Sequence, residues 1–154
     1  MTVLDNAIRI DASPERVWAT LAKLDVLHEY DPVVAKSEAL PGPRDGLGAS
    51  RQCDLKAGGW FRERVTAWVP QRALSFELFD CTLPVRRLTH SYTLTPEAGG
   101  TLVEQRMEYE LKFGPIGMLM DTLMVRRKSD AGIKGFFQGL KWYVETGGAR
   151  KGGR

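Results

Sequence analysis

Apolar and polar positions recur with two different periods along the chain, and each period occupies its own part of the sequence. Residues 115–146 have a helical period, in which positions three or four apart form one face. The face consists of Leu119, Leu123, Arg126, Asp130, Ile133, Phe137, Leu140 and Val144. Gly114 and Pro115 stand at the start and Gly147 follows the end, as is typical of helix termini. We therefore predict one long C-terminal helix over residues 115–146, with this face buried.

The middle of the predicted helix is unusual for a helix that packs in a core. Arg126 and Asp130 interrupt the apolar face, and glycines follow at positions 132, 135 and 139. Each glycine costs about 1 kcal/mol of helix propensity relative to alanine. One interpretation is a cavity beside this part of the helix. The alternative is a solvated Arg126–Asp130 pair at the edge of the face, with glycines that allow a bend or the close approach of another backbone.

The chain before residue 114 has the two-residue period of β-strands, divided by turn residues. The predicted strands are 3–10, 33–40, 49–55, 60–69, 73–83, 88–95 and 101–113. Two short helices follow the first strand. Ser13 and Pro14 form the start of one, and Asp31 before Pro32 ends the other. This order predicts a single α+β domain over residues 1–147.

The two-residue period also predicts which strand residues face the long helix. In residues 101–113 charged residues alternate with apolar or aromatic ones, so one face of the strand is dry. That face carries Val103, Gln105, Met107, Tyr109, Leu111 and Phe113. On the two preceding strands the corresponding residues are Leu88, His90, Tyr92 and Leu94, and Leu74, Phe76, Leu78 and Asp80. Glu63 is a further candidate for an inward polar residue.

Four short stretches of sequence, in their order along the chain, are typical of one protein superfamily. They are Ile-Asp-Ala-Ser-Pro-Glu-Arg-Val-Trp at 10–18, Gly-Leu-Gly-Ala at 46–49, Arg-Glu-Arg-Val-Thr-Ala-Trp-Val-Pro at 62–70 and Phe-Gly-Pro-Ile-Gly at 113–117. Together they resemble the START and polyketide cyclase/dehydrase superfamily, also called SRPBCC proteins, over residues 7–147. The resemblance implies the helix-grip fold, in which a seven-stranded curved antiparallel sheet wraps around the long C-terminal helix and encloses an apolar cavity.

The resemblance also implies the binding or carriage of a hydrophobic small molecule, such as a lipid, a quinone or a polyketide-like compound. The alternative is a polyketide cyclase or dehydratase that uses no cofactor, and a partner-binding module with a vestigial cavity is a third possibility. For a cavity ligand we expect contacts with Phe76, Leu78, Gln105, Met107, Leu123, Arg126, Ile133 and Phe137.

Three residues of the inward face are candidates for catalysis. His90 and Tyr92 are two positions apart on one strand, so their side chains share a face about 7 Å apart. His90 could move a proton while Tyr92 or Tyr109 holds a substrate carbonyl. The alternative is structural, with the tyrosine rings buried, their hydroxyls on water and His90 as a satisfied polar residue. No base and nucleophile with a fixed spacing support the catalytic interpretation.

The composition excludes several classes of function. The chain has 154 residues, of which 43% are hydrophobic and 27% charged, as in an ordinary folded domain. Part of the net charge of +3 lies in the glycine-rich basic segment 148–154, which we expect to be disordered. The remainder is nearly neutral, so we expect no nucleic-acid partner. No apolar run approaches the length of a membrane span, and we expect a cytoplasmic monomer or homodimer without stable membrane insertion.

Metal and nucleotide cofactors are not expected. Cys53 and Cys81 have no CxxC spacing, and with His28 and His90 they make too few ligands for a zinc site. Gly46 and Gly48 lack the third glycine of a dinucleotide loop, and residues 114–117 lack the lysine of a phosphate-binding loop.

Overall fold

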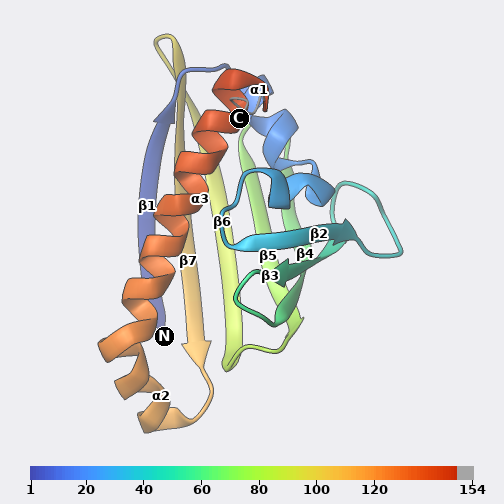
Figure 1. Cartoon of the computed structure of the whole chain (residues 1–154). Helices are drawn as coiled ribbons and strands as arrows, with labels where there is room; N and C mark the ends of the chain where they lie inside the picture. The colour runs from blue at the N-terminus through green and yellow to red at the C-terminus, as the bar shows by residue number, and fades with distance from the viewer. Residues whose placement is uncertain (149–154) are drawn as a thin grey trace, which may run out of the picture.

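The computed structural model describes residues 1–148, and these form one antiparallel sheet with helices packed on its concave face (Figure 1). The sheet order is β1-β7-β6-β5-β4-β3-β2. The strands are β1 (Thr2–Ile10), β2 (Val34–Ala39), β3 (Ser50–Leu55), β4 (Trp60–Val69), β5 (Ala73–Cys81), β6 (Val85–Glu97) and β7 (Gly100–Leu111). The predicted seven-stranded antiparallel sheet is confirmed. Of the expected disordered segment 148–154, all but Gly148 lies outside the described residues.

Two short helical segments follow β1, as predicted. In α1 (Pro14–Leu21) the Ser13 side chain accepts a hydrogen bond of 3.3 Å from the Arg16 N–H, which caps the first turn. The next segment, η1 (Leu24–Glu29), is a 3-10 helix. Figure 1 shows both near the C-terminal end of the long helix, where they cover one end of the sheet.

The C-terminal helix consists of three segments that continue one another. They are α2 (Gly114–Met120), a π-helical turn η2 (Asp121–Val125) and α3 (Arg126–Thr146). Asp121 and Arg126, at the two ends of the π turn, both have right-handed helical backbone angles. The long helix is therefore confirmed, with a local widening that the sequence did not predict. None of the helices described in residues 1–148 is long and apolar enough to cross a membrane.

The π turn changes which residues face the sheet. Ile133, Phe137, Leu140 and Val144 are buried as predicted. Leu119 and Leu123 were expected on the same face, but they are 60% and 64% exposed. A π turn contains about one residue more than an α turn and so rotates the preceding segment by about 100°. As a result Gly117 and Asp121 face the sheet in place of the two leucines.

The three glycines of α3 differ in how closely other atoms approach them. A Cβ atom added to Gly139 would lie 1.8 Å from the Tyr30 carbonyl oxygen, and one added to Gly135 would lie 3.2 Å from the Pro32 side chain. A Cβ at Gly132 would meet nothing within 4 Å. Gly139 therefore allows the chain after η1 to pack directly on the helix backbone. The Arg126–Asp130 pair of the alternative interpretation does not form, since Arg126 contacts Asp121 and Asp130 contacts Lys134.

Candidate ligand-binding site

A chain of three charged or titratable side chains crosses the concave face of the sheet. Arg51 on β3 contacts Oε1 of Glu63 on β4 through Nε at 2.7 Å and Nη2 at 2.6 Å. The other carboxylate oxygen, Oε2, lies 2.7 Å from Nε2 of His90 on β6. All three residues are at most 7% exposed. The sheet register places Arg51 directly opposite Glu63, which accounts for the two-point contact.

The surroundings of Glu63 keep its carboxyl group ionised. Burial by itself disfavours the charge, but Arg51 and His90 outweigh it and lower the pKa of Glu63 to about 2. A carboxylate only accepts hydrogen bonds, so Nε2 of His90 carries a proton and donates a hydrogen bond to Glu63. The contact orients the imidazole ring and directs Nδ1 away from Glu63.

Aromatic rings enclose this chain of polar groups. The Phe76 ring stacks on His90 with a centroid separation of 5.0 Å, and the Arg51 guanidinium lies 4.6 Å from the centre of the same Phe76 ring. Tyr92 meets His90 edge to face, and Phe136 of α3 packs on Tyr92. Burial raises the pKa of Tyr92 well above its usual value, so its hydroxyl stays protonated.

Two buried polar atoms at the centre of this arrangement have no partner within residues 1–148. They are Nδ1 of His90 and Oε1 of Gln105. Gln105 uses its amide nitrogen to donate a 2.9 Å hydrogen bond to the Tyr92 hydroxyl. Buried polar atoms in native proteins are nearly always paired, and leaving one unpaired costs about 1–3 kcal/mol. Two such atoms on one face of the sheet indicate a place where a polar group of another molecule could bind.

Two apolar residues of the inward face are partly exposed. Phe76, His90 and Gln105 are buried, whereas Leu78 and Met107 on the same face are only half-buried. Leu78 is the next inward residue after Phe76, and Met107 stands directly opposite His90. These two apolar side chains are therefore partly accessible to solvent on the face that carries the buried polar atoms.

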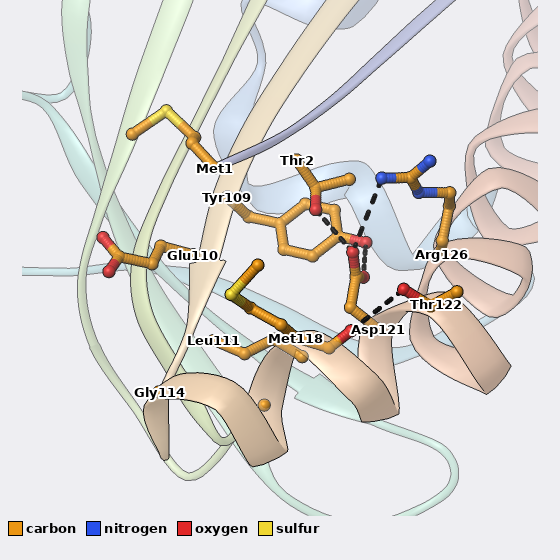
Figure 2. A pocket seen from close by; sticks show the side chains of 11 residues that line it. Met1, Thr2, Tyr109, Glu110, Leu111, Gly114, Met118, Asp121, Thr122 and Arg126 are labelled. Atoms are coloured by element: carbon orange, nitrogen blue, oxygen red, sulfur yellow. Dashed lines mark hydrogen bonds and ion pairs between the residues drawn. The ribbon is translucent and has the colours of Figure 1, made fainter.

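A separate hollow of about 250 Å³ lies where β1, β7 and α2 meet (Figure 2). At its base the Tyr109 hydroxyl and the Thr2 hydroxyl both donate to the carboxylate of Asp121. Arg126 reaches the same carboxylate at 3.8 Å. Burial, and after it the contact with the Asp121 carboxylate, raise the pKa of Tyr109 to about 12. Asp121 therefore connects the π turn to β1 and β7 through these hydrogen bonds.

The structure brings some of the predicted site residues together and separates others. Phe76, His90, Tyr92 and Gln105 form one cluster, and Ile133 and Phe137 belong to the buried face of α3. Tyr109 and Arg126 lie in the hollow around Asp121. Leu123 contributes to neither place, because the π turn directs it outward. The expected cavity between Ile133, Phe137 and the strands is not one of the two hollows found in residues 1–148, which are the one around Asp121 and a second beside Trp18 and Trp68.

Sequence reasoning missed the role of Arg51, Asp121 and Phe136. A signal for Arg51 existed, because it occupies an inward position between Ala49 and Cys53 on its strand, as Glu63 does on the next. Opposite charges at inward positions of neighbouring strands indicate a buried ion pair. No comparable signal marked Asp121, whose burial depends on the π turn. In residues 1–148 no group of three or more His, Cys, Asp or Glu side chains is arranged to hold a metal ion.

The chain matches one known protein family and is similar to several solved structures. Residues 1–145 match the family described as "Polyketide cyclase / dehydrase and lipid transport". No curated protein gives a significant match. Among solved structures, TTHA0849 from Thermus thermophilus is 21% identical with a TM-score of 0.82, and the match covers 96% of this chain and 100% of that chain.

Two further structures are similar across almost their whole length. The Zhui aromatase/cyclase from Streptomyces sp. R1128 is 12% identical with a TM-score of 0.80, and the match covers 99% of both chains. A START superfamily protein from Mycobacterium smegmatis is 14% identical with a TM-score of 0.78, and the match covers 94% of this chain and 97% of that chain. At these identities the similarity shows a shared helix-grip fold.

Proposed function

Because this chain belongs to the polyketide cyclase/dehydrase and lipid transport family, we propose that it binds a hydrophobic small molecule between the concave sheet and α3. The observation that supports this most directly is the pair of unpartnered atoms, Nδ1 of His90 and Oε1 of Gln105, among buried aromatic rings. An apolar surface with a few polar groups is typical of small-molecule sites. Half-buried Leu78 and Met107 would contact the apolar part of the ligand.

The hydrogen-bonding capacity of the two atoms restricts the polar group of the ligand. Nε2 of His90 donates to Glu63, so Nδ1 is an acceptor whenever the ring is neutral. The Gln105 amide nitrogen donates to Tyr92, which leaves Oε1 as an acceptor too. A ligand group that pairs with either atom must donate a hydrogen bond, as the single O–H of an alcohol, phenol or enol does to one acceptor at a time. We therefore propose a hydrophobic ligand that carries a hydroxyl group.

Binding to this site requires the side chains above it to rearrange. Phe136 packs on Tyr92, and Phe137 packs on Phe136 at 5.6 Å between ring centres. Protein interiors are close-packed, so a ligand has to displace these rings. Native mass spectrometry of the protein purified from its source cells is the first test. A retained apolar molecule supports carriage, and protein that is free of such molecules and also fails to bind hydrophobic probes contradicts it.

A titration with a matched pair of probes tests the polar anchor. We expect a hydrophobic phenol to bind about 5- to 100-fold more tightly than its methyl ether, because the phenol can donate to one of the two acceptors and the ether to neither. Gln105→Met should remove much of this difference. His28→Gln is the control, because the side chain of His28 is engaged with Ser37 away from the site. Equal affinities of phenol and ether would contradict the proposed anchor.

A second candidate function is cofactor-independent cyclisation or dehydration of a polyketide, and the His90–Glu63 contact favours it. A carboxylate that orients an imidazole also stabilises the imidazolium formed when the ring accepts a proton. Nδ1 of His90 would take a proton from a carbon between two carbonyl groups. The resulting enolate would attack a further carbonyl carbon and form a carbon–carbon bond. The oxygen of the attacked carbonyl would take the proton back from His90 and, in a later dehydration, leave as water.

Turnover of a poly-β-keto substrate distinguishes this function from carriage. A general base usually contributes about 10²–10⁴-fold, so His90→Gln should lower kcat by that factor while substrate binding changes little. His28→Gln again serves as the control and should keep the full rate. Absence of turnover by the unmodified protein, with retained binding of the substrate, would leave carriage as the function.

A further inference from the structure

The start of the C-terminal helix exposes an unusual number of large apolar side chains. We call this surface the apolar patch, and it consists of Phe113, Ile116, Leu119, Met120, Leu123 and Met124. These residues are 37–67% exposed. Single exposed apolar residues are common, but a contiguous group on one element indicates an interaction surface.

The π turn directs the patch away from the sheet. Gly117 and Asp121 are the buried residues of this part of the helix. Leu119 and Leu123 each follow one of them by two positions, which corresponds to about 200° around a helix. The two leucines therefore point away from the rest of the domain, which agrees with their exposure of 60% and 64%.

Positive charge borders the patch on both sides. Lys112 precedes it, and Arg126, Arg127 and Lys128 follow it directly. The only acidic residue between positions 112 and 128 is Asp121, which is buried against Tyr109 and pairs with Arg126 (Figure 2). Within residues 1–148, Arg127 and Lys128 take part in none of the ion pairs found, and both are exposed.

We propose that the apolar patch and its basic border bind the surface of an anionic lipid bilayer. Helices that lie in a membrane interface combine exposed apolar side chains with Lys and Arg, and each basic residue near an anionic surface raises the affinity about fivefold. A second copy of this chain fits less well, because a two-fold contact would bring the two basic borders together. The proposal goes beyond ligand binding and holds whichever molecule the interior accepts.

Flotation with vesicles tests the proposal on the full chain. We expect binding to vesicles of phosphatidylcholine mixed with phosphatidylserine, and at least tenfold weaker binding to pure phosphatidylcholine. Added salt should weaken binding to the mixed vesicles, because the basic residues act through an exposed field. No binding to either vesicle, or equal binding to both, would overturn the proposal.

Variants separate the apolar from the charged contribution. Leu119→Gln with Leu123→Gln should reduce binding more than tenfold, and Arg127→Glu with Lys128→Glu should do the same. Leu47→Gln and Lys36→Glu are matched controls, because Leu47 is 65% exposed elsewhere on the surface and the Lys36 side chain is 62% exposed. Leu123→Trp should retain binding, since tryptophan suits the membrane interface. Loss of binding in the controls would overturn the assignment to this patch.

The oligomeric state in solution provides an independent check. Light scattering over a range of concentrations should give a monomer both for the unmodified protein and for the Leu119→Gln, Leu123→Gln variant. A dimer that the variant converts to a monomer would show that the patch is covered by a second copy, and the membrane proposal would then be wrong. Because all of these substitutions are at exposed positions, circular dichroism should show unchanged folds.

Discussion

The glycines of α3 allow a test of the packing between the helix and the chain that follows η1. In Gly139→Ala the new Cβ would lie 1.8 Å from the Tyr30 carbonyl oxygen, well inside any allowed contact. Both atoms belong to the main chain or are fixed to it, so a backbone has to move. Alanine gains about 1 kcal/mol of helix propensity, but overpacking of this kind costs typically about 1–3 kcal/mol and occasionally more.

The cost at Gly139 should lie at the upper end of that range or beyond it. The oxygen would have to retreat by more than 1 Å, and Tyr30 is buried between Phe136 and Tyr143. We therefore expect Gly139→Ala to lower the free energy of unfolding by about 2 kcal/mol or more, after the gain in helix propensity is subtracted. Urea denaturation followed by circular dichroism measures this directly.

Gly132 is the matched control on the same helix. A Cβ there meets nothing within 4 Å, so Gly132→Ala should raise the free energy of unfolding by about 0.5–1 kcal/mol. Gly135→Ala should fall between the two, because its Cβ would lie 3.2 Å from the end of the Pro32 side chain. If Gly139→Ala stabilised the protein as much as Gly132→Ala does, the close packing of Tyr30 on α3 would be refuted.

Three further predictions concern the buried polar groups and the core. Glu63 has its pKa lowered from 4.5 to about 2, so its contribution is complete above pH 4.5 and is lost as the pH falls toward 2. The shift corresponds to about 3 kcal/mol, and acid unfolding of the wild type should show that loss, whereas Glu63→Gln should lack the same pH dependence. Asp121→Asn should lower the free energy of unfolding by about 1–3 kcal/mol, because it weakens the contacts with Tyr109 and Arg126. Unchanged thermal stability would show that Asp121 does not hold the π turn to the strands. Phe137→Trp should cost about 1–3 kcal/mol and weaken binding of a fluorescent fatty acid, and unaltered probe affinity would argue against a ligand beside α3.

Local patterns in the sequence predicted the elements well because their causes are local. The Ser13 cap, the proline at position 14 and the glycine-rich turns each act within a few residues, and the elements they delimit agree with the structure. The alternation of residues 101–113 likewise predicted that Gln105 and Tyr109 face inward. The strand ends differed by a few residues, since pairing with neighbours rather than propensity decides where a strand stops.

The candidate site was harder to predict because it depends on the register between strands. His90 and Gln105 were placed on the correct face, but their partners Glu63 and Tyr92 are set by pairing across the sheet. β4 also carries register shifts between Arg62 and Glu63 and between Val65 and Ala67, which a strict two-residue period cannot show. A constant helical period likewise cannot show the π turn, and it therefore assigned Leu119 and Leu123 to the wrong side of the helix.

The π turn has a consequence for how the helix tolerates a change in its length. A π turn holds one residue more than an α turn but covers about the same rotation. Removing a single codon from residues 122–125 would therefore leave an α turn, with Gly117 and Asp121 still toward the sheet and Leu119 still exposed. A one-residue insertion at this place can be absorbed in the same way without disturbing the buried faces on either side, and a comparison of amino acids position by position would record only a gap.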